Sequence, residues 1–195
     1  MVVPKEITFF PPPDPNENPW VHGKPIEEVI EVVDYDPEWV IQWQQLSADI
    51  KSVLGSAVLR LEHVGSTSVP HLAAKPIIDI DLIVEDPRQE KKYLPALEKL
   101  GYYLTVREPS FYQHRCFRLA KPRANLHVFG PACPEHIRHI LFRDWLRKHP
   151  EDRERYISAK LQAADNVTHV IDYNQRKHAV VHEIYMKIFK HQGLL

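Results

Sequence analysis

The chain has little cysteine, no strong excess of either charge and no long apolar run. Its 195 residues include only Cys116 and Cys133, too few for a disulfide framework and without the spacing of a metal site. It has 25 basic and 26 acidic residues, so the surface as a whole has no general attraction for a polynucleotide. No apolar stretch reaches membrane length, and the first residues lack a signal-peptide pattern. We therefore expect a reduced, cytoplasmic compartment, with neither a membrane nor a long nucleic acid as partner.

The composition of the first two dozen residues differs from that of the rest. Hydrophobic residues make up 44% of the chain, which suits one soluble domain with a full core. Residues 1–24, in contrast, are rich in proline, which favours extended conformation. We expect a disordered or surface-lying arm there, and the domain over residues 25–195. Alternatively the segment is a docking arm, anchored by Phe9, Phe10 and Trp20 on the domain or on a second copy in a homo-oligomer.

Local patterns predict an α/β fold, with a mixed sheet, flanking helices and a helical C-terminal part. Alternating or β-branched runs indicate strands, while apolar stripes bounded by proline, aspartate or glycine indicate helices. Ile41 and Leu161 are expected on the inward faces of their helices. The expected strands cover residues 26–35, 59–64, 77–84, 102–106, 111–119 and 124–129, and the expected helices begin near residues 37, 86, 134, 151 and 172.

The stretch with the most chemistry runs from Leu59 to Glu85. A predicted strand ends at a polar turn over residues 65–68, whose backbone N–H and hydroxyl groups can hold an anion. The next strand is β-branched except for Asp79 and Asp81. Side chains alternate along a strand, so these two acids point to one face, roughly 6 to 7 Å apart. Two like charges on a buried face need partners.

A divalent metal is one such partner. Carboxylate oxygens suit Mg²⁺ or Mn²⁺, which bridges the phosphates of a nucleotide in many enzymes. The turn would then approach the same phosphates through Gly65, Ser66, Thr67 and Ser68. The alternative is structural, with both acids hydrogen-bonded to local backbone or paired with arginines.

The residues of this stretch also carry a family resemblance. Gly65-Ser66, twelve further residues and then Asp79-Ile80-Asp81 resemble the signature of the DNA polymerase β-like nucleotidyltransferase superfamily. The longer string HVGSTSVPHLAAKPIIDIDLIV resembles the GrpB family, also grouped as UPF0157, in which a Gly-Ser-Thr turn, an Ala-Lys-Pro segment and the acidic strand come in this order. The resemblance covers residues 29–189 and includes residues 126–129, residues 141–147 and Tyr156 with Lys160.

This resemblance implies a minimal nucleotidyltransferase fold and a set of site residues. Asp79 and Asp81 would hold the metal. Polymerase β-like sites usually take a third carboxylate from a neighbouring strand, and residues 124–129 supply none. His127 stands at the corresponding place, as a metal ligand or a base. Lys75 and Arg143 would neutralise phosphate charge, and the further cationic candidates are Arg60, Arg115, Arg118, Arg147 and Lys160.

The implied reaction is nucleotidyl transfer from a nucleoside triphosphate to a small acceptor. Two other classes stay open. One is a non-catalytic nucleotide-binding or assisting module related to coenzyme A metabolism, since the GrpB domain is joined to dephospho-CoA kinase in some proteins. The other is an ATP-dependent ligase or tailoring enzyme that acts on a small metabolite in the same pocket.

Two other enzyme classes find little support in the chain. Twelve histidines include His178 and His182, which are four residues apart on a predicted helix. However, the zinc metalloprotease motif has glutamate directly after its first histidine, where this chain has Ala179. Ser66 and Ser68 lie in a turn between strand and helix but lack the Gly-x-Ser-x-Gly elbow of serine hydrolases.

Overall fold

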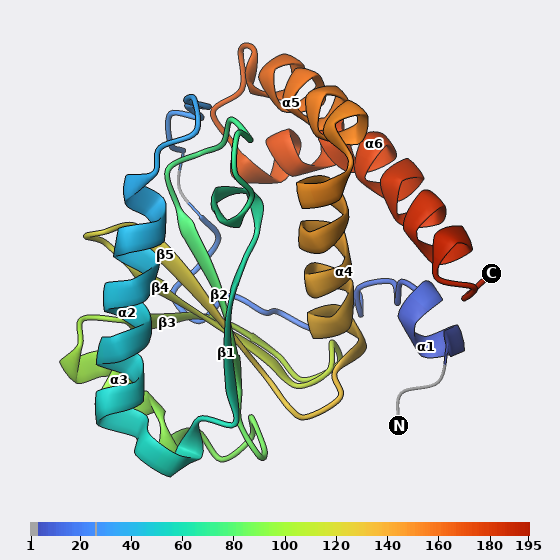
Figure 1. Cartoon of the computed structure of the whole chain (residues 1–195). Coiled ribbons are helices and arrows are strands. Elements are labelled where there is room, and N and C mark those ends of the chain that lie inside the picture. Colours follow the sequence, from blue (N-terminus) through green and yellow to red (C-terminus); the bar gives the residue numbers. More distant parts are fainter. Residues whose placement is uncertain (1–3, 26) are drawn as a thin grey trace.

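The computed structural model describes residues 4–25 and 27–195, and its centre is a twisted sheet of five strands (Figure 1). Their spatial order is β1-β2-β5-β4-β3. β2 and β5 are parallel, and the other neighbouring pairs are antiparallel. The mixed α/β sheet with flanking helices is therefore confirmed. The strands are β1 (Arg60–Val64), β2 (Ile78–Ile83), β3 (Tyr103–Glu108), β4 (His114–Leu119) and β5 (Ala124–Phe129).

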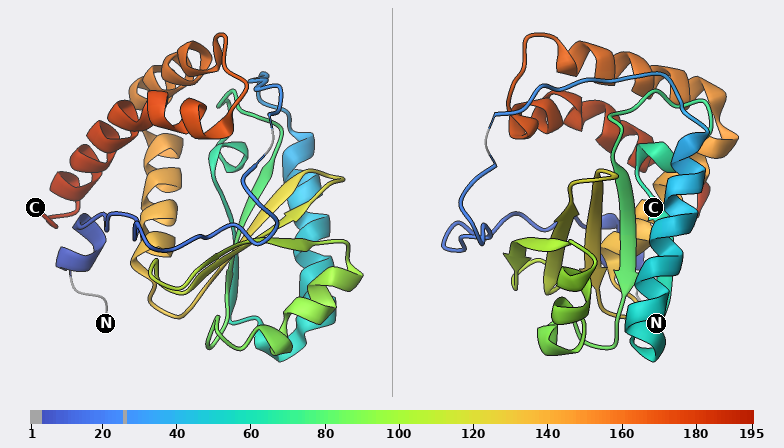
Figure 2. Two further views of the ribbon diagram at one scale, coloured as in Figure 1. Left: turned by 180° about the vertical axis from the view of Figure 1, so that it is seen from behind. Right: turned by 90° about the vertical axis from the view of Figure 1, so that its left-hand side faces the viewer.

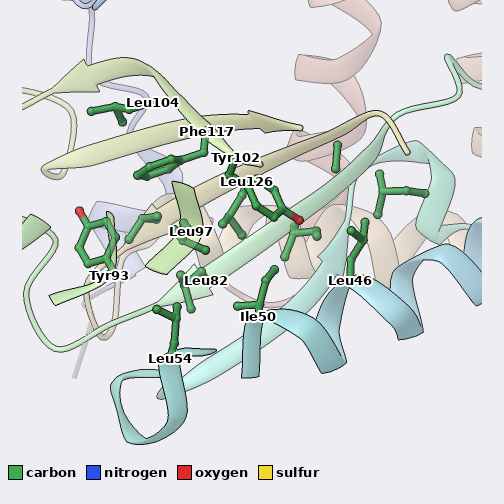
Figure 3. Packing of buried hydrophobic residues seen from close by; sticks show 14 of the residues in the cluster. Leu46, Ile50, Leu54, Leu82, Tyr93, Leu97, Tyr102, Leu104, Phe117 and Leu126 are labelled. Atoms are coloured by element: carbon green, nitrogen blue, oxygen red, sulfur yellow. The ribbon is translucent and has the colours of Figure 1, made fainter. Parts of the chain in front are cut away.

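One face of the sheet carries the main hydrophobic core. The helix α2 (Glu38–Leu54) packs there, together with the short helix α3 (Leu94–Lys99), and Figure 3 shows leucine and isoleucine side chains of α2 directed at the strands. Asp36 accepts the backbone N–H of Glu38 at 2.9 Å at the start of α2, and Gly55 ends it with a φ of 51°. Alternate residues of β2 and β5 face this core and are fully buried: Ile78, Ile80, Leu82, Leu126 and Val128.

The opposite face is covered only in part, by three helices in sequence. α4 (Pro134–Lys148) lies against β1 and β2, while α5 (Pro150–Ala164) and α6 (Val170–His191) cross beyond its end (Figures 1 and 2). These helices share a second apolar cluster that includes Leu146, Ile184 and Phe189. The face of the sheet that remains uncovered forms one wall of a cavity. In the described part of the chain, no helix is both long and apolar enough to cross a bilayer.

The proline-rich segment lies along the domain. Residues 1–3 of this arm are outside the described part, and Pro4–Thr8 forms the helix α1 instead of the extended conformation expected. Ile7 is buried in the second apolar cluster, and the Phe10 ring lies 5.3 Å from that of Tyr185. Trp20 then pairs with Val106 at the edge of β3, where Figure 2 shows the arm crossing the sheet. Phe10 and Trp20 therefore contact this domain, while Phe9 is exposed.

Some local expectations were wrong. Residue 26 lies outside the described part, and residues 27–35 form no strand, because they make only one bridge, between Val33 and Ala74, and Ile30 packs against α5 and α6 instead. Residues 86–92 form a turn and a short 3-10 helix, so α3 begins only at Leu94, where Pro95 occupies the first turn. Ile41 and Leu161 are exposed, not inward-facing.

Candidate functional site

A cavity of about 580 Å³ lies between the polar face of the sheet, the turn after β1 and the first half of α6. Side chains alternate along each strand, so every second residue of β2, β4 and β5 faces the core and the residues between them face the cavity. These cavity-facing residues are mostly polar. From β2 comes Asp79, from β5 Asn125 and His127, and from β4 His114, Cys116 and Arg118.

The turn predicted to bind an anion closes directly over Asp79. Gly65 has a φ of 67°, and a side-chain carbon added to it would lie 2.8 Å from the Cβ of Asp79. Only glycine allows both the conformation and this approach. Gly65 and Ser66 line the cavity. Thr67 and Ser68 are buried instead, and their hydroxyls donate to the carbonyls of Ile77 and Gly65. These two hydroxyls fix the turn, and neither residue lines the cavity, contrary to the expectation.

Asp79 and Asp81 share a face, as expected, but their surroundings differ. Asp79 lines the cavity and accepts the side-chain N–H of Asn125 at 2.9 Å. Burial raises its pKa, while this hydrogen bond and the charge of Lys75 act in the opposite direction. Its carboxylate is therefore the acid of the pair that a ligand in the cavity can reach.

Asp81 is fully buried behind two histidines of α4. His136 and His139 approach its carboxylate through Nδ1 at 2.8 and 3.0 Å. Burial alone would raise the pKa of Asp81, but the charge of His139 and the hydrogen bonds of both histidines hold it below its usual range. In turn, Asp81 and Glu135 raise the pKa of His139 well above its ordinary value despite its burial. Asp81 and His139 therefore form an ion pair, and the His139 ring faces the cavity.

The chemistry of these donors suits a hard cation, with one condition. Asp79 offers a carboxylate oxygen on the cavity side, which is the ligand type that Mg²⁺ and Mn²⁺ prefer. Asp81 offers the same type, but its carboxylate is occupied by His136 and His139. A cation held by both acids must therefore replace His139 as the charge partner of Asp81.

Three lysines also line the cavity or its rim. Lys75, Lys160 and Lys177 line it together with the aromatic ring of Tyr173, and the ammonium groups of Lys75 and Lys177 lie 5.1 and 5.0 Å from the centre of that ring. Lys160 is buried and donates to the carbonyl of Ala73, and burial together with the charge of Lys177 lowers its pKa to about 6. Lys75 and Lys160 were predicted, whereas Lys177 was not.

Four predicted arginines lie outside this cavity. Arg143 donates to Glu62 at 2.9 Å and to the carbonyl of His63 at 3.0 Å, behind the turn. Arg147 donates to the carbonyl of Ser68 at 2.7 Å, so both arginines support the backbone that carries Gly65 and Ser66. Arg115 is buried on the core face beside Glu90, and Arg60 is exposed beside Glu62. Neither side chain lines the cavity, because Arg115 points to the other face of the sheet and Arg60 lies on the surface at the start of β1.

His127 lies where its register predicted it, beside the acids. It pairs with Asp81 across the parallel strands, just as Asn125 pairs with Asp79, so these two residues take the places where an acid was missing. Burial and the neighbouring charge of His114 lower the pKa of His127 to about 3, which keeps its imidazole neutral. Its Nδ1 lies 3.0 Å from Nε2 of His114 on β4.

Other residues line the cavity although no sequence motif pointed to them. His114 and Cys116 stand two residues apart on β4, and Cys116 lies directly across from His127 in the hairpin. Strand alternation combined with the hairpin register could have found these two. His139 and Lys177 come from helices, whose docking on the sheet depends on long-range packing.

The sequence matches a known protein family and several of its members. A family model described as GrpB protein matches residues 29–187. A UPF0157 protein of Halalkalibacterium halodurans is 44% identical over 162 residues, 83% of either chain, and one of Streptomyces coelicolor is 41% identical over 71% of this chain and 72% of that protein. The dephospho-CoA kinase of Mycolicibacterium paratuberculosis is 27% identical over 79% of this chain but only 45% of its own length.

The fold has a solved counterpart. The crystal structure of conserved protein GrpB from Enterococcus faecalis superposes with a TM-score of 0.73 at 32% identity, and the match covers 83% of this chain and 99% of that one. The family model, the close relatives and this structure agree that the chain belongs to the GrpB family.

Proposed function

We propose that the protein transfers a nucleotidyl group from a nucleoside triphosphate to a small acceptor, with the help of a divalent metal. The observation that carries this proposal is the close approach of the Gly65–Ser66 turn to Asp79, in a cavity that Lys75 and Lys177 also line. Backbone N–H groups of a glycine turn and lysine ammonium groups both favour phosphate oxygens. The cavity volume of about 580 Å³ lies in the range of small-molecule sites.

The roles in the site follow from position. Asp79, with Asp81, would hold Mg²⁺ or Mn²⁺, which supplies charge neutralisation at the phosphates. Lys75, Lys177 and Arg118 line the same cavity and would contact the phosphates. An oxygen or nitrogen of the acceptor attacks the α-phosphorus, the bond from that phosphorus to the bridging oxygen breaks, and pyrophosphate leaves with the bonding electrons. The proton of the acceptor passes to solvent, because a pKa of about 3 makes the imidazole of His127 a weak base.

A second candidate is a binding or assisting module without turnover. It is favoured by the dephospho-CoA kinases that match this chain over less than half of their own length. On this alternative the same cavity would hold dephospho-CoA or a nucleotide, and no group would be transferred.

Calorimetry separates these proposals. ATP, GTP, CTP, UTP and dephospho-CoA are each titrated into the protein with Mg²⁺ or Mn²⁺, and pyrophosphate release is then measured with pooled small acceptors. We expect one triphosphate to bind only with metal, and Asp79→Asn to reduce its affinity at least tenfold. The matched control is Asp86→Asn, because Asp86 lies outside the cavity beside Arg88.

The outcomes differ for each proposal. Binding of dephospho-CoA, or of a triphosphate without pyrophosphate release, would favour the assisting module. If no triphosphate binds with either metal, the nucleotidyl-transfer proposal is wrong. Thermal unfolding of each variant checks that a loss of binding does not come from a loss of folding.

A further inference from the structure

Three side chains on the β4–β5 hairpin form a cluster distinct from the two acids: His114, Cys116 and His127. They come from alternate positions of antiparallel strands, and their ligand atoms all lie within 4.8 Å of one another. All three line the cavity. We propose that this His-Cys-His cluster binds a transition-metal ion, most naturally Zn²⁺, at a site separate from Asp79 and Asp81. The inference stands on these three residues and does not rest on nucleotidyl transfer.

The two histidines are already close to the separation that an ion requires. Nε2 of His114 and Nδ1 of His127 are 3.0 Å apart. Two imidazole nitrogens on tetrahedral zinc, each at about 2.0 to 2.1 Å from the ion, lie about 3.3 Å apart, and a nitrogen and a thiolate sulfur lie about 3.6 Å apart. The ion would take the place of the proton that the two nitrogens now share, after these move apart by tenths of an ångström. The sulfur of Cys116 lies within 4.8 Å of the nitrogens and would approach them by up to about 1.2 Å.

A carboxylate already orients the first ligand. Glu108 on β3 lies 2.7 Å from Nδ1 of His114. This contact places a proton on Nδ1, so that the lone pair of Nε2 points toward His127. Histidines that bind metals commonly have such a carboxylate on their other nitrogen, because it fixes the tautomer and the ring orientation. The hydrogen bond that His114 donates to Glu108 therefore prepares His114 as a metal ligand.

The donor types select the metal. A thiolate and two imidazoles favour zinc and similar transition metals, whereas Mg²⁺ prefers oxygen. A thiol binds Zn²⁺ as the thiolate, so Cys116 would release its proton when the ion binds. Cys133, the other cysteine, is buried beside Phe129 and Ile83 in a different cluster.

The site would have an open fourth position. Three protein ligands plus one exchangeable ligand is the pattern of catalytic zinc, and here the cavity lies beside all three. The fourth ligand would be water or an oxygen, nitrogen or sulfur atom of the small molecule in the cavity. On this inference His127 serves as a metal ligand and not as a base.

Metal titration tests the proposal. The full-length protein is stripped with a chelator, titrated with Zn²⁺ against a chromophoric competitor, and its bound zinc is counted by mass spectrometry. We expect one tight ion per chain, with affinity at least tenfold lower in Cys116→Ser and in His114→Gln. Glu108→Gln should lower it about 10- to 100-fold. Loaded with Co²⁺, the wild-type protein should show a thiolate charge-transfer band that Cys116→Ser lacks.

Each control variant removes one cysteine or one histidine that lies outside the cluster. Cys133→Ser removes the other buried thiol, and His182→Ala removes a histidine of the exposed α6 pair with His178. Both variants should bind zinc as tightly as the wild type. The proposal is wrong if the wild-type protein holds no stoichiometric Zn²⁺, or if Cys116→Ser and His114→Gln bind it unchanged. Because no nucleotide is present, failure here is distinguishable from failure of nucleotidyl transfer.

Discussion

The two faces of the sheet are built from alternate residues of the same strands, yet they meet opposite requirements. On the face toward α2, Ile80, Phe117 and Leu126 are fully buried among apolar side chains. On the other face, the neighbouring positions carry acids, histidines, a cysteine and an arginine around a cavity. The first face contributes hydrophobic stabilisation. The second buries ionisable groups, which oppose folding unless they are paired. The comparison separates the face that stabilises the fold from the face that carries the candidate site.

Removing a large side chain from the core face should give the largest effect. Phe117→Ala leaves a cavity at a fully buried position, and we expect the free energy of unfolding to fall by about 3–5 kcal/mol. Arg118→Ala changes the next residue, on the cavity face, and should alter stability by no more than about 0.5 kcal/mol. Urea unfolding measures both. An equal loss in the two variants would contradict the division of roles between the faces.

The second largest effect on stability should come from the turn over Asp79, because its close approach depends on the backbone conformation of Gly65. Gly65→Ala places a methyl group 2.8 Å from the Cβ of Asp79 in a backbone conformation that favours glycine. We expect a loss of about 2–4 kcal/mol, together with loss of nucleotide binding. Gly55→Ala is the matched control, since it also has a positive φ but nothing within 4 Å of the added carbon.

The control should cost only about 1 kcal/mol of backbone strain and leave ligand binding intact. Denaturant unfolding and nucleotide calorimetry are measured on both glycine variants. If Gly65→Ala is no more destabilising than Gly55→Ala, the turn does not need its close approach to Asp79.

The core face could be predicted from the sequence, because the patterns that define it lie within single strands and helices. Alternation placed Ile80 and Leu126 on one side, and Asp36 and Gly55 set the ends of α2. The strand expected over residues 26–35 failed for a non-local reason: Ile30 found its partners on α5 and α6, not in the sheet.

The cavity face could be read only in part. Asp79, His127 and the Gly65–Ser66 turn follow from motif and register. That Asp81 would be enclosed by His136 and His139 depends on how α4 docks, and Lys177 depends on the crossing of α6. Arg143 matched a motif, but its partners Glu62 and the carbonyl of His63 give it a supporting position behind the turn.

The smallest effect should come from Lys160, a cavity residue whose ionisable side chain is almost fully buried. Burial lowers its pKa from 10.5 to about 6, so between these values the unfolded chain binds a proton that the folded chain does not. Stability therefore rises with pH across this window, and at pH 7 the buried amine opposes folding. Lys160→Met removes this opposition but leaves the carbonyl of Ala73 without its donor.

We expect Lys160→Met to raise the free energy of unfolding at pH 7 by about 1–3 kcal/mol, after the lost hydrogen bond is subtracted. The gain should shrink toward zero as the pH approaches 10, because the lysine of the unfolded wild type then loses its proton as well. Lys99→Met, at an exposed lysine of α3, should change stability by no more than about 0.5 kcal/mol. Urea unfolding at several pH values measures both variants. A variant that is more stable yet binds the nucleotide less tightly would show that this face retains a buried lysine for its ligand, whereas a loss of stability at pH 7 would place Lys160 among the residues that the fold itself requires.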